Sequence, residues 1–270
     1  MSFTLNTSSS TPFLSCDVFA AAGGVAHGFS TRLGGVSAGA CAGLNLGCSR
    51  GDDPAFVTEN LRRFTTAIGA DGTRLVKTRQ VHRDHIQPVS DEDVCRDFFA
   101  PAPWECDGLI TDRPGLCLTI FTADCVPVLL YDPVARCIAA VHSGWRGTAL
   151  SIAPKAVERM VADYGCRREH ILAAIGPSIS RCCFETHADV PQALTHALGA
   201  DTTPFIHPLP ADKFKVDLQG IVAHDLSRAG LALHHICVTD HCTACRSDLY
   251  WSHRLLGTQR GSMASMIQLL

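Results

Sequence analysis

Short runs of apolar residues along the chain predict strands in its middle and helices on either side. The runs VPVLLY, after Cys125, and CIAAV at 137–141 lack the alternation of a half-exposed strand and are typical of strands buried on both faces. Further strands are predicted over residues 25–30, 74–89, 107–142, 170–176 and 234–240.

Helix start and stop signals bound the helices. Asp52 or Asp53 is placed as an N-cap, Pro54 falls in the first turn, and Gly69 marks the end of an amphipathic helix. A second helix is predicted over 147–165, ending at Gly165, with Pro154 either kinking it or marking its true start. Residues 188–199 and 217–230 also have helical patterns.

The order of these elements favours a mixed-sheet α+β fold over regular βαβ alternation, because several consecutive strands are separated only by turn signals. The length of 270 residues suits one large domain or two small ones. Residues 1–12 contain a Ser/Thr-rich stretch, and we expect them to form a loose tail.

The composition argues against nucleic acid and membranes as partners. A net charge of -3 gives no electrostatic footprint for nucleic acid or an anionic membrane surface, and no apolar run is long enough to span a bilayer. The N-terminus has neither the basic start nor the apolar region of a signal peptide. With 14 cysteines in such a chain, we expect a reducing, cytoplasmic setting in which most thiols pack as small hydrophobes.

Polar residues of chemical interest stand where the two buried strands end. If Asp132 pairs with Ala135 across the DPVA turn, the register places Cys125 directly opposite His142. A thiol beside an imidazole suits a nucleophile–base pair with Asp124 as orienter, or a transition-metal site. A buried cysteine beside a hydrogen-bonded histidine is the non-catalytic alternative.

A metal site needs a third ligand, and the segment KTRQVHRDHI offers His82 and His85. Spacing alone does not choose between them. A His/Cys/His set leaves one position of a tetrahedral metal open, which is the catalytic pattern.

Glycines and arginines suggest an anion site. Gly144 and Gly147 allow close approach of the backbone, and Arg146 lies beside the expected helix start, where free N–H groups favour phosphate. Arg32 precedes two further glycines, although a solvated surface arginine is an equal alternative there.

The segment CTAC at 242–245 could be a redox pair or half of a zinc knuckle. The chain has no second CxxC, so ordinary buried thiols are favoured, and the adjacent Cys182 and Cys183 are interpreted in the same way.

Seven segments occur in an order that closely resembles one family. They are FSTRLGGVS, LNLGCSRGDDPAFVTENLRRF, QVH, TADCVPVLLYD, AAVHSGWRGT, GPSIS and DHCTAC…MASMIQL. The resemblance is to the laccase-domain family, described as polyphenol oxidases and later as purine nucleoside phosphorylases with adenosine deaminase activity. Bacterial members are also called peptidoglycan editing factors.

The resemblance implies a single domain over 1–270, built as a layered sandwich of packed mixed β-sheets flanked by helices. It implies His82, Cys125 and His142 as metal ligands, with zinc favoured and copper as the alternative. Arg32, Asn45, Asp124 and Arg146 match motif positions that line the family pocket. The chain departs from the family pattern at Arg83, which falls at the expected pocket rim, and at YWSHR (250–254) and RGSMA, which concern the C-terminal contribution to the pocket and not the metal ligands.

The resemblance therefore implies phosphorolysis of adenosine, inosine and, as a further candidate, methylthioadenosine, together with deamination of adenosine. Asp124 is the candidate proton shuttle, Arg146 and Arg32 the phosphate ligands, and Gly144 a close contact. A Cys–His hydrolase acting on peptidoglycan precursors and a copper-dependent polyphenol oxidase are the alternatives. Against the oxidase, no two of the 13 histidines are separated by a single residue, although multicopper oxidases bind their metal mostly through His-X-His pairs. The sequence does not predict the oligomeric state.

Overall fold

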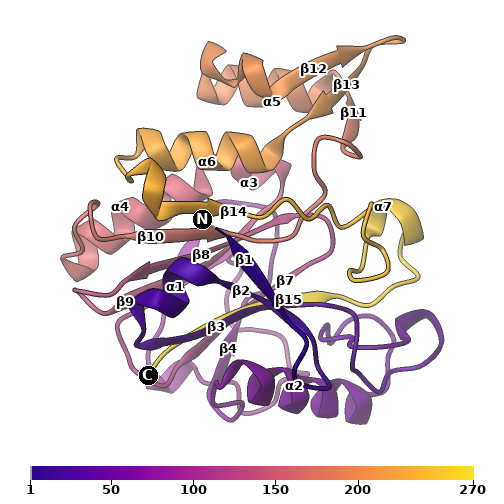
Figure 1. Ribbon diagram of the computed structural model, residues 1–270, viewed down its shortest axis with the longest axis vertical. Helices are drawn as coiled ribbons and strands as arrows, with labels where there is room; N and C mark the ends of the chain where they lie inside the picture. Colours follow the sequence, from indigo (N-terminus) through magenta and orange to yellow (C-terminus); the bar gives the residue numbers. More distant parts are fainter. Residues whose placement is uncertain (1) are drawn as a thin grey trace.

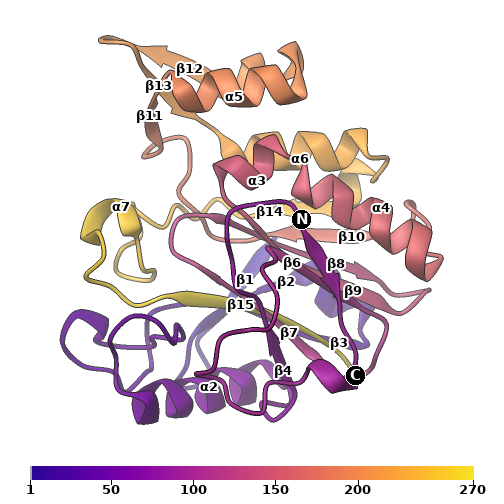
Figure 2. The same ribbon diagram turned by 180° about the vertical axis from the view of Figure 1, so that it is seen from behind.

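The computed structural model, which describes residues 2–270, has four layers in the order helix, sheet, sheet, helix (Figures 1 and 2). The first sheet contains, in spatial order, β1 (Phe3–Asn6), β2 (Phe13–Cys16), β3 (Val25–Ser30), β15 (Met263–Leu269), β7 (Cys117–Thr122) and β4 (Leu75–Lys77). The second contains β14 (Ile236–Val238), β10 (Leu172–Ile175), β8 (Val126–Asp132), β9 (Cys137–Ser143), β6 (Gly108–Thr111) and β5 (Ile86–Pro88). Both sheets are mixed, because β4–β7, β5–β6 and β10–β14 pair in parallel and the other pairs are antiparallel.

Helices cover the outer face of each sheet. Helix α2 (Pro54–Ile68) packs on the first sheet, and α3 (Trp145–Ala149), α4 (Ile152–Tyr164) and α6 (Leu218–Arg228) lie over the second. The structure also contains short helices α1 (Asp17–Ala22) and α7 (His253–Leu256) and four 3₁₀ turns, at Gly39–Cys41, Asp91–Asp93, Ala200–Phe205 and Leu233–His235. The predicted α+β sandwich is confirmed.

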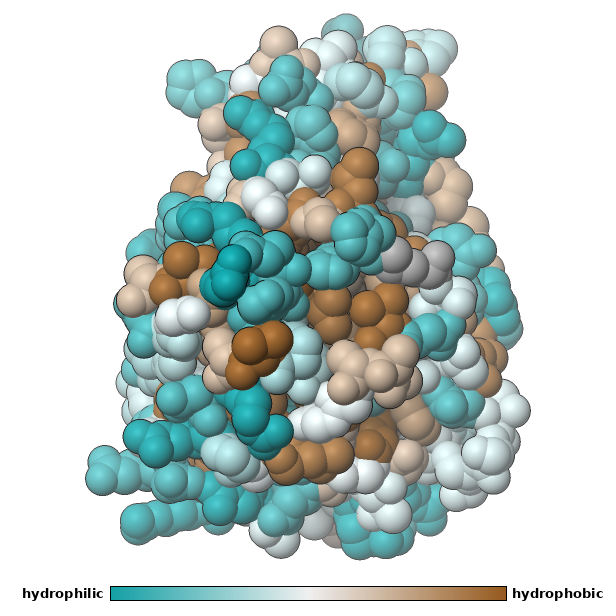
Figure 3. Space-filling view, turned by 60° about the vertical axis from the view of Figure 1, so that its left-hand side comes forward, coloured by the Kyte–Doolittle hydropathy of each residue, from teal (hydrophilic) through white to brown (hydrophobic). Residues whose placement is uncertain are grey.

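A small lobe stands beyond the second helical layer. It contains α5 (Asp189–Leu198) and a three-stranded sheet of β11 (Glu185–His187), β13 (Lys213–Val216) and β12 (Ile206–Leu209). In the space-filling view the lobe rises from a wider body, and hydrophobic side chains on this face gather towards the middle of the body (Figure 3). Within residues 2–270, no helix combines the length and apolar character needed to cross a membrane.

The core has three main parts, one between each pair of adjacent layers, and a smaller fourth cluster of Ile179, Cys242 and Ala244. Leu118 and Ile120 of the first sheet meet Leu129 and Tyr131 of the second in the central part. Because both faces of β8 and β9 are covered, every residue of these strands is buried, as their continuous apolar runs predict. Strand β8 sends Val128 and Leu130 to the helices and Leu129 and Tyr131 to the other sheet.

Helix α2 has the predicted boundaries. The Asp53 carboxylate accepts a hydrogen bond from the Ala55 N–H at 2.8 Å, Pro54 is the first helical residue, and Gly69 ends the helix at a left-handed φ of 74°.

Three local predictions are wrong. The N-terminal residues are not a loose tail, because Phe3–Asn6 pair with Phe13–Cys16 and the Phe3 ring packs 5.8 Å from that of Phe29. The strand expected over 74–89 is two short strands separated by a loop. The helix expected over 147–165 is two helices that part at Ser151, whose φ of 56° is left-handed; of the two alternatives for Pro154, the one that marks a helix start is confirmed, because Pro154 falls in the first turn of α4.

Candidate active site

The hairpin of β8 and β9 brings Cys125 and His142 together, but by a register different from the predicted one. Asp132 pairs with Cys137, so Pro127, not Cys125, lies opposite His142. The turn is two residues wider because the Asp132 carboxylate accepts the N–H groups of Val134 and Ala135, and Arg136 takes a left-handed φ of 53°. A shift of two residues preserves the face of a strand, and Cys125 therefore still lies on the same side as His142.

His82 completes a cluster with these two residues. The ligand atoms of His82, Cys125 and His142 all lie within 4.8 Å of one another, and the two imidazole rings meet edge to face with centroids 4.8 Å apart. His82 is exposed, Cys125 half-buried and His142 buried.

The loop after β4 brings His82 into the cluster and leaves His85 outside it. His82 takes a left-handed φ of 59°, which is uncommon for a residue with a side chain. His85 is exposed and its Nε2 lies 3.2 Å from Gln87 Oε1, outside the cluster. Of the two histidines that spacing left open, His82 is therefore the one that meets Cys125.

Asp107 holds this loop and also orients His142. Its buried carboxylate accepts the backbone N–H groups of Val81, His82 and Arg83 at 2.9–3.1 Å. The same carboxylate lies 2.8 Å from His142 Nδ1, and the Asp107 carbonyl accepts the His142 N–H at 2.7 Å. Sequence analysis missed Asp107, whose only signal is an acid placed directly before the buried strand Gly108–Thr111.

The charges of Cys125 and His142 support each other. Burial would raise the pKa of the Cys125 thiol, but the adjacent His142 and His82 lower it to about 6. Burial would lower the pKa of His142, yet the negative charge of Cys125 and the hydrogen bond to Asp107 raise it to about 9. Each of these two groups therefore favours the charged form of the other.

Gly144 forms the floor beneath the cluster. A Cβ atom at this position would stand 2.7 Å from His82 Nδ1 and 3.3 Å from Cys125 Sγ. The close approach of Gly144 to a bound ligand stays a prediction, and its neighbours in the structure are the clustered side chains themselves.

Asp124 does not orient His142, contrary to its expected role in a nucleophile triad, since Asp107 occupies that position. Its backbone has a φ of 86°, and its buried carboxylate accepts three hydrogen bonds from the C-terminal part of the chain. The donors are Thr243 Oγ1 at 2.6 Å, Ser252 Oγ at 3.1 Å and the Arg254 N–H at 2.6 Å. Asp124 therefore fixes the C-terminal loops beside Cys125.

A pocket of about 160 Å³ opens next to the cluster. Its lining residues are Ala123, Asp124, Cys125, Trp145, Ile179, Phe184, Leu218, His253 and Arg254. Aromatic and aliphatic walls with a few polar groups are typical of small-molecule sites. The C-terminal segment that departs from the family pattern supplies His253 and Arg254 to this wall.

Arg146 is exposed, and its guanidinium stacks 4.1 Å from the ring centroid of Trp145, a pocket residue. It lies within the five-residue helix α3 and not before a long helix, so the predicted contribution of a long helix N-terminus is wrong. Arg146 is not itself among the residues that line the pocket, and it reaches the pocket only through its stacking on Trp145.

Arg32 and Asn45 make structural contacts. The Arg32 guanidinium stacks 3.9 Å from the Trp251 ring and donates to the Ser247 carbonyl. The Asn45 amide is fully buried: its nitrogen donates to Asp52 and to Gly47, and its oxygen accepts the N–H groups of Gly47 and Ser262. Neither residue is among those lining the pocket.

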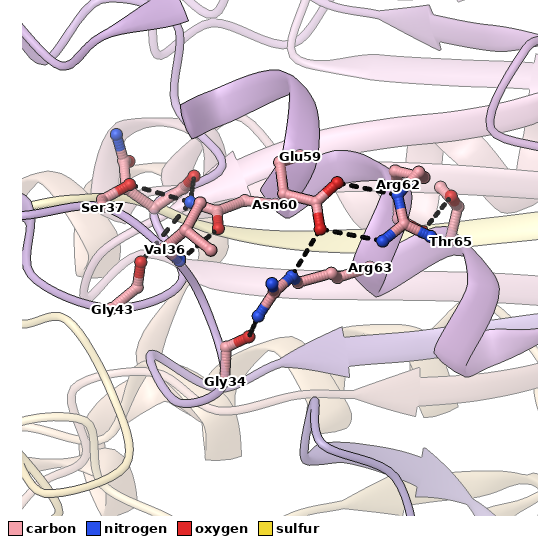
Figure 4. Close-up of polar contacts among 10 residues, drawn as sticks. Gly34, Val36, Ser37, Gly43, Glu59, Asn60, Arg62, Arg63 and Thr65 are labelled. Atoms are coloured by element: carbon pink, nitrogen blue, oxygen red, sulfur yellow. Dashed lines mark hydrogen bonds and ion pairs between the residues drawn. The ribbon is translucent and has the colours of Figure 1, made fainter. Parts of the chain in front are cut away.

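Helix α2 fixes the loop between these two residues (Figure 4). Asn60 accepts the Val36 N–H and donates to Ser37 Oγ and to the Asn45 carbonyl, and Arg63 donates to the Gly34 carbonyl. The family resemblance places Arg32 and Asn45 at pocket positions. In the structure, their contacts anchor this loop.

Arg260 is a further cation that sequence analysis missed. Its side chain is buried, and its Nε has no hydrogen-bond partner among the described residues. Burial lowers its pKa to about 10, with Arg50 acting in the same direction and the negative charges of Asp124 and Cys125 opposing it.

The His82–Cys125–His142 cluster fits a transition metal. Two imidazoles and a thiolate are ligands that zinc prefers, and tetrahedral zinc has bonds of about 2.0–2.1 Å to nitrogen and about 2.3 Å to sulfur. Asp107 binds Nδ1 of His142, which leaves Nε2 free as a ligand atom, and such a carboxylate–histidine contact is typical behind metal ligands.

Comparison with known proteins identifies the family. Residues 26–270 match the family model described as multi-copper polyphenol oxidoreductase laccase. The chain belongs to this family. It is 35% identical over 259 residues to the purine nucleoside phosphorylase YlmD of Geobacillus stearothermophilus, covering 94% of this chain and 92% of that one.

The mouse purine nucleoside phosphorylase LACC1 is 30% identical over 254 residues, which cover 90% of this chain and 55% of LACC1. The chain thus spans about half the length of LACC1. Its match to the purine nucleoside phosphorylase of Deinococcus radiodurans covers 61% of that protein. The crystal structure of Bacillus licheniformis hypothetical protein YfiH superposes with a TM-score of 0.92 at 30% identity, covering 98% of this chain and 99% of that one. The layered fold implied by the resemblance is confirmed.

Proposed function

We propose that the chain is a purine nucleoside phosphorylase acting on adenosine and inosine, with methylthioadenosine as a further candidate substrate, and that it also deaminates adenosine. One observation carries the proposal: His82, Cys125 and His142 converge beside a small, largely apolar pocket in a chain whose relatives are named purine nucleoside phosphorylases. The apolar walls suit a purine ring, and Trp145 and Phe184 are the aromatic residues available to contact it.

His82, Cys125 and His142 would hold the metal, for which zinc is favoured and copper is the alternative. A metal bound there supplies Lewis acidity, which makes water easier to deprotonate and stabilises developing negative charge. Asp107 keeps the His142 ring oriented, and the Gly144 floor leaves room for the three ligand side chains.

Phosphorolysis needs a held dianion and an oriented ribose. A phosphate oxygen attacks C1′, the bond from C1′ to the purine nitrogen breaks, and the leaving base gains a proton. Arg146 at the pocket edge is the proposed phosphate ligand, because its guanidinium is exposed and aligned by stacking on Trp145. Arg32 is assigned a supporting role through Trp251.

Deamination uses water instead of phosphate. Water adds at C6 of adenine, the bond from C6 to the exocyclic nitrogen breaks, and ammonia leaves with the transferred proton. The carboxylate of Asp124 already accepts three hydrogen bonds, so its proposed role shifts from proton shuttle to positioning the pocket wall.

A second candidate is a Cys–His hydrolase acting on peptidoglycan precursors. Cys125 beside His142, with Asp107 at the far ring nitrogen, has the arrangement of nucleophile, base and orienting acid. Chelated protein separates the candidates, because a thiol hydrolase stays active without metal.

The test of the proposal is turnover of adenosine and inosine with and without phosphate. We expect release of free base and ribose 1-phosphate only with phosphate, and release of ammonia from adenosine in either condition. Phenol oxidation with oxygen uptake, in the absence of nucleoside turnover, would instead favour the copper oxidase.

A further inference from the structure

A second cluster of potential metal ligands lies apart from the three residues of the active site. The thiols of Cys182, Cys183, Cys242 and Cys245 lie within 4.8 Å of one another. Cys245 Sγ is 3.5 Å from Cys182 Sγ and 3.4 Å from Cys183 Sγ. The sequence-based interpretation of these residues as ordinary buried thiols is wrong, because Cys182 and Cys245 are exposed and only Cys242 is buried.

We propose that these four cysteines form a structural zinc site that ties the Ser178–Phe184 turn to the Cys242–Cys245 turn. Tetrahedral zinc with four sulfur ligands at about 2.3 Å places neighbouring sulfurs about 3.8 Å apart. The observed sulfur–sulfur contacts of 3.4 and 3.5 Å approach this value and are far from the length of about 2.05 Å in a disulfide.

The backbone around the cluster is arranged as in a ligand-binding turn. Ser178 and Cys242 form a β-bridge, the Thr243 N–H donates to the Ser178 carbonyl at 2.9 Å, and the Ser180 N–H donates to Cys242 Sγ at 3.4 Å. Hydrogen bonds to ligand atoms are a regular feature of metal sites. Cys182 and Cys183 are adjacent in sequence, closer than in most zinc motifs, but they lie in a turn that directs both sulfurs to Cys245.

Two cations lie beside the first cysteine pair. Lys215 donates to the Cys182 carbonyl, and Arg254 donates to the Cys183 carbonyl at 3.0 Å. Four thiolates around one Zn²⁺ carry a net charge of about -2, which these cations would balance.

The proposed site would stabilise one wall of the active-site pocket. Ile179 and Phe184 flank the first cysteine pair, and Arg254 reaches Cys183; all three line the pocket. Thr243, inside the CTAC turn, donates to Asp124 beside Cys125. Loss of this zinc should therefore raise the KM for nucleoside more than it lowers kcat.

The test is zinc content by elemental analysis and native mass spectrometry on full-length protein purified under reducing conditions. We expect two zinc ions per chain in the unchanged protein and one in Cys125→Ala. Cys245→Ser should also retain one, whereas Cys95→Ser, a half-buried cysteine outside both clusters, should retain two.

X-ray absorption of zinc-loaded Cys125→Ala identifies the ligands of the remaining zinc without altering the four cysteines. This measurement therefore tests the proposal even if Cys245→Ser fails to fold. We expect a single sulfur shell at about 2.3 Å. If Cys125→Ala protein contains no zinc, and its four cluster thiols are either freely alkylated or paired in disulfides, the proposal is overturned. Failure of nucleoside turnover with an intact four-sulfur shell would overturn only the proposed function.

Discussion

Asp107 connects the parts of the candidate active site at the scale of single residues. It lies 35 residues from His142 and 25 from His82 in the sequence, yet its carboxylate contacts both. Sequence spacing could not reveal this role, since the contact exists only after β6 pairs with β9. Spacing also left His82 and His85 as equals, because the left-handed backbone at His82 decides between them.

Asp107→Asn should weaken zinc binding about 10–100-fold, the usual cost of losing a carboxylate behind a ligating histidine. The amide keeps the size but not the charge of the carboxylate. Competition with a chelator measures the affinity. Asp132→Asn, a buried carboxylate that caps the far turn of the hairpin, is the matched control and should leave the affinity unchanged. Equal affinities in both variants would refute the role of Asp107.

His82→Ala should release zinc from the active site during dialysis, because two ligands hold the ion too weakly. His85→Ala should retain it, since that imidazole contacts Gln87 and not the cluster. The zinc content of the two variants after dialysis shows which histidine is the ligand. Retention by His82→Ala together with loss from His85→Ala would contradict the assignment.

At the scale of elements, apolar runs predicted most strands and helices. The turns that connect them were predicted less well. The hairpin register was missed by two residues because the Asp132 side chain stabilises a wider turn. Helices α3 and α4 are separate because Ser151 takes a left-handed φ. The sequence does not mark this break, since the residue is not a glycine. Cys125 and His142 do not pair, but they still meet, since a two-residue shift keeps the strand face.

Helix α3 carries the prediction for phosphate. Arg146→Ala should raise the KM for phosphate severalfold and leave deamination of adenosine nearly unchanged, because only phosphorolysis binds a dianion at the pocket edge. Steady-state kinetics of both reactions measure this, with Arg113→Ala, an exposed arginine elsewhere, as control. Equal loss of the two activities would mean that Arg146 organises the pocket instead.

Strand β3 contains a pH-sensitive contact with the start of α1. Buried His27 accepts the Cys16 N–H at 2.8 Å, and burial lowers its pKa from 6.5 to about 4. The unfolded chain then binds a proton before the folded one does. Stability is therefore complete above pH 6.5 and should fall by up to about 3 kcal/mol as the pH drops towards 4.

His27→Gln keeps an acceptor for the Cys16 N–H but does not titrate. Urea unfolding at several pH values between 7 and 4 should show a shallower loss of stability in this variant than in the unchanged protein. The same slope in both proteins would show that His27 does not contribute.

At the scale of the whole molecule, the two ends of the chain complete the fold around the site. Strand β15 lies between β3 and β7 in the first sheet, and the loops before it bind Asp124 and line the pocket. The sequence predicted the layered class and the three clustered ligands through family motifs. It could not predict the pocket wall, because that wall joins segments more than a hundred residues apart whose contacts follow from packing.

The most direct test compares zinc content and phosphate-dependent release of purine base in Cys125→Ala and in the unchanged protein, with Cys95→Ser as a cysteine control. The account predicts that Cys125→Ala stays folded by circular dichroism, loses one zinc per chain, and loses base release by more than about a hundredfold, since outer contacts alone cost up to that much. Cys95→Ser should match the unchanged protein. A folded Cys125→Ala protein that keeps full zinc occupancy and full base release would contradict the account.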